Sequence, residues 1–253
     1  MLNFIKNIFL RGNTDNQKKQ NLSNDISYED ELLYKFGTNE NSIVNHINLL
    51  IITDTHNCLY YDKESIEKIK NAQYDICLIL GDVSNNDIIE VLKFVPYEKI
   101  YGLLGNHDGL DRFEESKIRN LNGKVITVNN VRIAGLQGSH RYKTGDYGMY
   151  THEESIQLAN EIPEADILVS HDRPFIKDNN DNVHDGLKGV TYYCYKNHVK
   201  LEIHGHLHEE SEETLKNGTK VLGKYKVDIT IKNTPTSLLL LLKAYVTPKV
   251  HGP

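Results

Sequence analysis

The fold is decided by the stretch INLLIITDTH, residues 47–56, where a continuous apolar run ends abruptly in acidic and basic side chains. A short apolar run bounded by polar residues is typical of a strand buried on both faces, as in the parallel sheets of α/β proteins. We therefore predict a strand over Ile47–Thr53. Asp54 and His56 then lie just past its carboxyl end.

The same pattern recurs along the rest of the chain. Six more apolar runs are predicted as strands: Asp75–Leu80, Lys99–Leu104, Lys124–Val128, Val131–Leu136, Asp166–Ser170 and Lys200–Ile203. Helices are predicted over Lys63–Asn71, Asn86–Phe94 and Asp111–Leu121, and from Thr151, which forms a capping-box pattern with Glu154. Residues Lys220–Lys232 alternate between apolar and polar and are predicted as one half-exposed strand. Alternating strands and helices indicate an α/β domain.

The 253 residues are enough for one large domain with a substantial core. We place it at residues 43–232, with structure starting near Ile43. Residues 1–42 are predicted as a short N-terminal helix and a flexible linker, because Gly12–Asn24 is polar and lacks an apolar period. Residues 233–253 are predicted as a C-terminal strand and tail.

Composition and charge exclude several classes of protein. The formal net charge is −6 and the basic residues are scattered, which argues against a duplex nucleic-acid binder. No apolar segment reaches the length of a membrane span. The three cysteines, Cys58, Cys77 and Cys194, form no C-x-x-C pair. They are predicted as buried free thiols of a cytoplasmic protein. The oligomeric state stays open.

Polar side chains gather at the ends of the predicted strands, where loops of an α/β sheet converge and bind ligands. They are Asp54, His56, Asp82, Asn106, His107, Asp108, His171, His204, His206 and His208. Each cluster alone could be an ordinary turn. Three imidazoles directly after an apolar strand, however, cost solvation energy unless a metal ion compensates. Mixed oxygen and imidazole donors suit Mn, Fe, Zn or Ni rather than Ca. Two such ions about 3.5–4 Å apart can clamp a phosphate.

The motifs and their order resemble those of the calcineurin-like metallophosphoesterases, over about Ile47–Glu209. The matching motifs are D-x-H at 54–56, GD at 81–82, GNHD at 105–108, His171 and GH-x-H at 205–208. This resemblance implies a four-layer α/β/β/α sandwich with a two-metal site at the strand ends. The stretches at 135–151, 171–174 and 184–186 also resemble a branch of small bacterial and phage-type phosphoesterases.

The resemblance also implies a role for each site residue. One divalent ion, with Mn preferred and Fe, Zn or Ni possible, would be held by Asp54, His56, Asp82 and His208. The second would be held by Asp82, Asn106, His171 and His206, with Asp82 bridging. A metal-bound hydroxide would attack phosphorus in line. His107 would stabilise or protonate the leaving group, and Asp108 would orient His107.

Other residues near the motifs keep two interpretations each. Arg141 is a candidate phosphate contact, in addition to Asn106, because guanidinium forks match phosphate oxygens; it is equally a surface arginine in a loop. Tyr142 and Tyr150 could stack on a nucleobase or cover the core. His184 could support His171 or lie exposed, and His204 is expected to be structural. The remaining histidines, His46, His140, His152 and His198, are predicted to face solvent.

Differences from known branches of this superfamily narrow the class of substrate. Protein Ser/Thr phosphatases of this superfamily have Asp-Arg-Gly in the second motif and Glu at the end of the third, whereas this chain has Asp82-Val83-Ser84 and Asp108. Asp172 and Arg173 also depart from the small residues usual after the metal histidine. The leading hypothesis is a phosphodiesterase acting on a small, nucleotide-like phosphorylated substrate. The alternatives are a metal-dependent nuclease, which the acidic balance disfavours, and a non-catalytic scaffold, which the complete ligand set disfavours.

Overall fold

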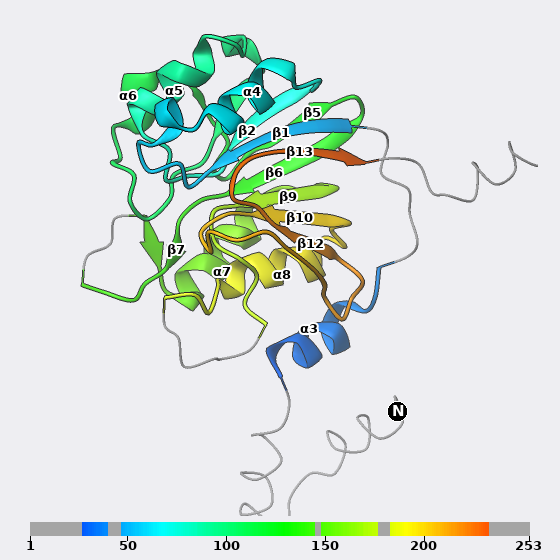
Figure 1. The fold of residues 1–253 in the computed structure, drawn as a ribbon. Coiled ribbons are helices and arrows are strands. Elements are labelled where there is room, and N and C mark those ends of the chain that lie inside the picture. Colours follow the sequence, from blue (N-terminus) through cyan, green and yellow to red (C-terminus); the bar gives the residue numbers. More distant parts are fainter. Residues whose placement is uncertain (1–26, 40–46, 145–147, 177–182, 233–253) are drawn as a thin grey trace, which may run out of the picture.

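The computed structural model describes residues 27–39, 47–144, 148–176 and 183–232. Within them, two large sheets pack face to face (Figure 1). The first has the strand order β13-β1-β2-β3-β4 and the second has the order β11-β12-β10-β9-β6-β5. Helices α4, α5 and α6 lie beside the first sheet, and α7 and α8 lie beside the second (Figure 1). The predicted four-layer α/β/β/α sandwich is confirmed.

The first sheet consists of β1 (Ile47–Thr53), β2 (Ile76–Ile79), β3 (Ile100–Gly102), β4 (Arg119–Asn120) and β13 (Lys226–Lys232). The second consists of β5 (Val125–Val128), β6 (Val131–Leu136), β9 (Ile167–Ser170), β10 (Leu201–His204), β11 (Ser211–Thr214) and β12 (Lys220–Gly223). A small pair is formed by β7 (Ser139–His140) and β8 (Met149–Tyr150). The helices are α3 (Tyr28–Phe36), α4 (Lys63–Asn71), α5 (Asn85–Leu92), α6 (Arg112–Ser116), α7 (His152–Glu161) and α8 (Lys188–Lys196). Short 3₁₀ turns cover Leu59–Tyr61 and Tyr97–Lys99.

Strand β1 is buried on both faces, as its apolar run predicts. Leu49 and Ile51 point into the core between the two sheets, whereas Leu50 and Ile52 pack under the helices of the first layer. Successive side chains of a strand alternate between faces, so only a continuous apolar run can fill both cores. The central core between the sheets also includes Ile203 of β10.

Two predicted elements are wrong in their extent. The helix predicted over Asp111–Leu121 stops at Ser116, because Lys117 adopts a left-handed backbone with φ of 58°, and the chain then forms β4. The single strand predicted over Lys220–Lys232 is two strands in different sheets. β12 runs parallel to β10 in the second sheet, and β13 runs antiparallel to β1 in the first. Lys224 and Tyr225 therefore cross from one sheet to the other.

Helix α3 precedes the predicted start of the domain and packs on it. Ser27 caps the helix and forms a capping box with Asp30. Leu32 is buried, and the carboxylate of Glu29 accepts hydrogen bonds from the Tyr195 hydroxyl at 2.6 Å and from the Lys216 amide at 3.2 Å. The predictions for residues 1–26 and 233–253, including the N-terminal helix, linker and tail, lie outside the described residues, as does His46.

The cysteines follow the sequence prediction in part. Cys77 and Cys194 are buried and free, whereas Cys58 is exposed, so the prediction of a buried thiol is wrong there. Cys58 is exposed because it sits in the loop after β1 rather than in a strand. In the part of the chain that the structure describes, no helix is both long and apolar enough to cross a membrane.

Candidate metal centre

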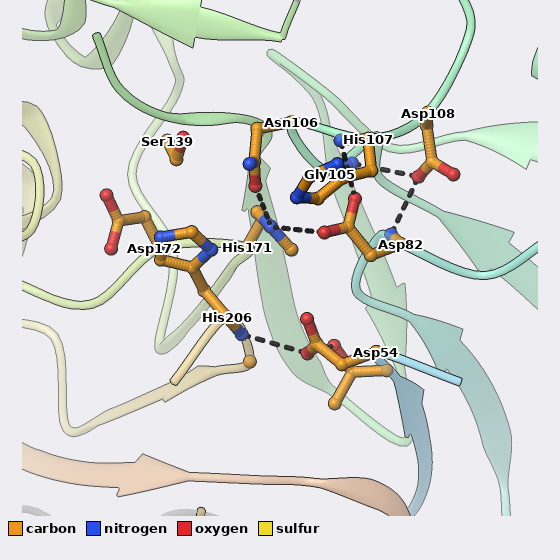
Figure 2. Close-up of polar contacts among 12 residues, drawn as sticks. Asp54, Asp82, Gly105, Asn106, His107, Asp108, Ser139, His171, Asp172 and His206 are labelled. Atoms are coloured by element: carbon orange, nitrogen blue, oxygen red, sulfur yellow. Dashed lines mark hydrogen bonds and ion pairs between the residues drawn. The ribbon is translucent and has the colours of Figure 1, made fainter. Parts of the chain in front are cut away.

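The predicted metal ligands come from five loops that follow strands of both sheets. Asp54 and His56 follow β1, Asp82 follows β2, and Asn106 follows β3 in the first sheet. His171 follows β9, and His206 and His208 follow β10 in the second. Most of these side chains meet in one place (Figure 2).

Two groups of side chains have their donor atoms close enough to share an ion. One group is Asp54, His56 and His208, and the other is Asp82, His171 and His206; within each, the donor atoms lie within 4.8 Å of one another. In the first group, His208 Nε2 lies 3.0 Å from His56 Nε2 and 3.5 Å from Asp54 Oδ1. The structure thus brings six of the predicted ligands into two neighbouring clusters. Asn106 joins the second, with its Oδ1 2.9 Å from His171 Nε2.

The backbone at these residues is unusual. Asp54, His56, Asp82, His206 and His208 all have positive φ, between 46° and 67°. Side chains with a Cβ seldom adopt this left-handed conformation, and where they do the strain is commonly associated with function. Tertiary contacts hold it in place. Asp54 Oδ2 accepts the His206 amide at 2.8 Å, which ties the two sheets together at the site (Figure 2).

The second cluster has an excess of acceptor atoms around one imidazole. His171 Nδ1 donates to the Leu80 carbonyl oxygen at 2.9 Å, so Nε2 of the neutral ring carries the lone pair. That lone pair faces Asn106 Oδ1 at 2.9 Å and Asp82 Oδ2 at 3.5 Å (Figure 2). Three acceptors that converge in this way repel one another unless a proton or a cation lies among them.

Charge and burial also favour a cation. Burial alone would lower the pKa of His171, but the carboxylates of Asp82, Asp54 and Asp172 together raise it above its usual value. In the first cluster, Asp54 Oδ1 is buried and has no hydrogen-bond partner among the described residues. A buried carboxylate oxygen without a partner is costly, and a bound metal ion would satisfy it. The donors present therefore fit two divalent cations.

Two motif glycines are required by close packing on these ligands. A Cβ on Gly105 would overlap the Asp82 carboxylate. A Cβ on Gly205 would overlap Thr53 Oγ1 and Asp54 Oδ2. Only glycine leaves room for the backbone to approach the carboxylates at these two points.

The two residues predicted as catalytic differ in their exposure. His107 is exposed, and its ring centroid lies 5.6 Å from that of His56. Asp108 is buried, and its Oδ2 accepts the amides of Asp82 at 2.8 Å and Gly105 at 2.9 Å (Figure 2). Its Oδ1 forms an ion pair with Arg112 at 3.1 Å. These contacts brace the backbone of the metal-binding loops rather than the His107 ring. Burial raises the pKa of Asp108.

Arg112 is a residue that sequence reasoning missed. It lies four residues after Asp108, on α6, and also donates to Asn85 Oδ1 at 2.9 Å. The spacing from the GNHD motif was the available signal, because residues four apart on a turn and helix can pair.

Arg141 contacts residues outside both clusters. Its guanidinium donates to Glu154 at 2.9 Å and to the Met149 carbonyl at 3.2 Å. These contacts favour the interpretation as an arginine that fastens its loop. The neighbouring Tyr142 does reach the site, because its hydroxyl accepts from Asn106 Nδ2 at 3.3 Å. This bond orients the Asn106 amide so that its oxygen faces His171.

The two residues that depart from the usual pattern after His171 have structural partners. Asp172 is buried and accepts the His140 amide at 2.9 Å, and Arg173 pairs with Glu213 at 2.9 Å. His184 lies beside His206, with ring centroids 5.5 Å apart, rather than beside His171.

The remaining histidines divide into three groups. Burial lowers the pKa of His204 to about 4, so this structural histidine is neutral. His140 and His152 were predicted to face solvent, but they are partly buried and stack on each other with centroids 4.2 Å apart. The prediction is wrong because His140 of β7 and His152 of α7 cover each other, and His152 also packs against Phe175. His198 is exposed as predicted. Tyr225, which the sequence did not single out, stacks on His208 with centroids 5.4 Å apart.

Comparison with known proteins agrees with this geometry. Residues 47–210 match the model of the family described as calcineurin-like phosphoesterase. An uncharacterized protein of Haemophilus influenzae is 26% identical over 178 residues, which cover 56% of this chain and 76% of that protein. An uncharacterized protein of Methanocaldococcus jannaschii is 25% identical over 185 residues, covering 66% of this chain and 83% of its own. A crystal structure of a Thermus thermophilus protein has a TM-score of 0.51 at 12% identity and covers 75% of this chain and 99% of its own, a likeness of fold alone.

The two-layered sheet core and the paired clusters define a metal-dependent phosphoester hydrolase. The chain belongs to the calcineurin-like phosphoesterase family, since the family match spans well over half of it.

Proposed function

We propose that this protein is a dinuclear phosphodiesterase acting on a small, nucleotide-like phosphate ester. The observation that carries the proposal is the pair of clusters, each built from a carboxylate and imidazoles and lying next to the other around Asp54 and Asp82. When bound, two cations supply the positive charge that holds phosphate oxygens and lowers the pKa of a water. Asp54, His56 and His208 would hold one ion, and Asp82, Asn106, His171 and His206 the other, with Asp82 able to bridge. The mixed donors favour Mn, with Fe, Zn and Ni as alternatives.

His107 would act on the leaving group. It is exposed and lies beside His56 of the first cluster, so its ring is free to approach the ester oxygen of a phosphate held there. An imidazolium there can donate a proton to that oxygen as the bond to phosphorus breaks. The His107 amide donates to Asp82 Oδ1 at 2.8 Å, so the position of His107 is linked directly to a metal-ligand candidate.

The direct test is hydrolysis of a chromogenic phosphodiester and a chromogenic phosphomonoester by protein loaded separately with Mn²⁺, Fe²⁺, Zn²⁺ or Ni²⁺. We expect faster turnover of the diester. His107→Ala should lower kcat by about 10²–10⁴-fold, the usual contribution of general acid catalysis. His198→Ala is the matched control, because His198 is exposed and outside the site. Protein that binds no metal and hydrolyses neither ester would overturn the proposal, and it would favour a scaffold.

A further inference from the structure

A cavity of about 300 Å³ is lined by residues of the loop after β1 and of α5, none of which belongs to either cluster. One wall is the loop after β1, beginning at Asn57, the residue directly after His56. The other wall is the helix α5. The lining consists of Asn57, Tyr60, Tyr61, Asn86, Asp87, Ile89 and Glu90. We propose that this cavity binds the nucleobase of the substrate, an inference that rests on the phosphodiesterase function proposed above.

The cavity is fixed relative to the metal centre. Asp87 of α5 is buried and holds the loop after β1 at two points: its Oδ2 accepts the Thr55 hydroxyl at 2.7 Å and its Oδ1 accepts the Leu59 amide at 2.9 Å. His56 lies between these two anchor points. A group bound in the cavity would therefore keep a constant position relative to His56 and to a phosphate on the metals.

The cavity exposes large aromatic and aliphatic side chains. Tyr60 is 65% exposed, Tyr61 is 81% exposed and Ile89 is 57% exposed. The two tyrosine rings meet edge to face, with centroids 5.2 Å apart and planes at 89°, so stacking between them hides neither ring. Clustered exposed aromatic residues next to a reactive site indicate a binding surface. Planar bases stack on such rings regardless of sequence.

The polar groups of the cavity match the edge of a base and not a phosphate. Its lining includes Glu90 and Asp87 and contains no lysine or arginine. Asn57 Oδ1 accepts hydrogen bonds from Ser84 and from Asn86 Nδ2, both at 3.0 Å. Among the described contacts, the Asn57 Nδ2 donors and the Asn86 Oδ1 acceptor make no hydrogen bond, so they remain for a ligand.

These groups favour a base with an exocyclic amino group. A carboxylate such as Glu90 accepts from the amino group of cytosine, and an asparagine amide pairs with adenine. Glu90 Oε1 pairs with Lys93 Nζ, whereas Glu90 Oε2 makes no hydrogen bond among the described contacts. Uracil presents a carbonyl oxygen where cytosine presents its amino group, and Glu90 Oε2 would repel it. The occupant is therefore a nucleotide whose base carries an amino group.

The first experiment measures binding without hydrolysis. Saturation-transfer NMR with cytidine and uridine, neither of which carries a phosphate, should show transfer to the cytosine ring protons and weaker transfer to uracil. The variants Tyr60→Ala and Tyr61→Ala, singly and together, should abolish it. Tyr34→Ala is the control, since Tyr34 is 60% exposed on α3, far from α4 and α5 (Figure 1). Unchanged transfer in the double variant, or equal transfer to both nucleosides, would overturn the proposal.

The second experiment measures specificity with two diesters that share one leaving group. These are the p-nitrophenyl ester of cytidine 5′-monophosphate and methyl p-nitrophenyl phosphate. The ratio of their kcat/KM values should fall about 10-fold in the double tyrosine variant, as expected for loss of base stacking. The melting temperature should not change, since both side chains are exposed. A constant ratio would overturn the nucleobase site. No hydrolysis of either ester by wild type would instead overturn the proposed function, and the NMR result would still decide the cavity.

Discussion

The two sheets bring different chemistry to the metal centre. The loops of the first sheet supply both carboxylates and the amide, from Asp54, Asp82 and Asn106, together with His56. The loops of the second sheet supply imidazoles only, from His171, His206 and His208. Each cluster draws on both sheets. Neither sheet alone presents a complete set of ligands, so the site exists only where the two sheets meet.

This difference shows why the packing of the sheets and the binding of metal must depend on each other. The bond from the His206 amide to Asp54 and the bond from His171 to the Leu80 carbonyl both cross from one sheet to the other. A metal ion with ligands from both sheets would form a further link between the sheets. Metal that binds the folded state alone stabilises it by mass action.

Among changes to the metal-ligand candidates and their supports, the largest effect is expected from removing the carboxylate of the first sheet from the buried cluster. Asp82→Ala would leave only imidazoles from the second sheet and the Asn106 amide. We expect kcat to fall by about 10³-fold, the upper end of what loss of one electrostatic group costs, together with loss of bound metal. Kinetics and metal analysis by mass spectrometry measure both. Asp228→Ala, on β13, is the control. Retention of two ions with kcat within tenfold of wild type would show that the imidazoles of the second sheet hold the ion.

Removing one imidazole of the second sheet at a time tests the two clusters separately. The His208 side chain is 50% exposed, whereas His206 is buried. Water screens an exposed ion more strongly, so the cluster containing His208 should bind its ion more weakly. His208→Ala should therefore bind one ion instead of two, whereas His206→Ala should weaken the tighter ion by about 10–100-fold. Equilibrium dialysis with Mn²⁺ measures both, with His198→Ala as the control. Equal losses in the two variants would contradict this asymmetry.

A smaller effect on kcat is expected from removing Arg112, which supports the metal-ligand candidates of the first sheet indirectly. Arg112→Ala removes the ion pair that holds Asp108, which in turn holds the Asp82 and Gly105 amides. Loss of such a supporting partner should lower kcat by about 10-fold. Arg112→Lys should recover part of this activity, and the control Arg119→Ala, on β4, should keep the activity of wild type. The steady-state kinetics of the three variants decide the point; equal activity in Arg112→Ala and wild type would remove Arg112 from the support.

The smallest effect is a pH dependence of the free energy of unfolding that arises from His152, on a helix beside the second sheet. Burial lowers the pKa of His152 on α7 to about 4, below that of the unfolded chain. Between about pH 6.5 and pH 4 the unfolded state therefore binds more protons. The contribution of neutral His152 to the free energy of unfolding is present in full above pH 6.5 and is lost as the pH falls to 4. Since the His152 ring is half-buried and water screens its charge, we expect this contribution to unfolding free energy to be about 1 kcal/mol.

Urea unfolding at pH 7 and pH 4.5 tests this expectation. His152→Gln should show a smaller loss of unfolding free energy between the two pH values than wild type does. His198→Gln should match wild type, because His198 is exposed. If all three proteins lose the same free energy, His152 has no part in the pH dependence.

Local signals explain which elements could be predicted. The strands β1, β2 and β6 are apolar runs with polar ends, and α7 has a readable capping box at Thr151 and Glu154. Helix α8 was missed because most of its residues are buried, which removes the polar face that a helical period needs. Helix α3 was missed although Ser27 and Asp30 form a capping box, a signal that could have located it.

The sequence by itself determined an α/β domain and the candidate ligands, because buried strands demand apolar runs and the chemistry demands particular side chains directly after them. The four-layer sandwich followed from the resemblance of the motifs to those of the family. Only the tertiary structure decided that β12 and β13 join different sheets, that Asp108 braces Asp82, and that Arg141 faces Glu154. These depend on where distant segments meet, and hydrophobic patterning specifies which face a residue occupies without specifying its partner across space.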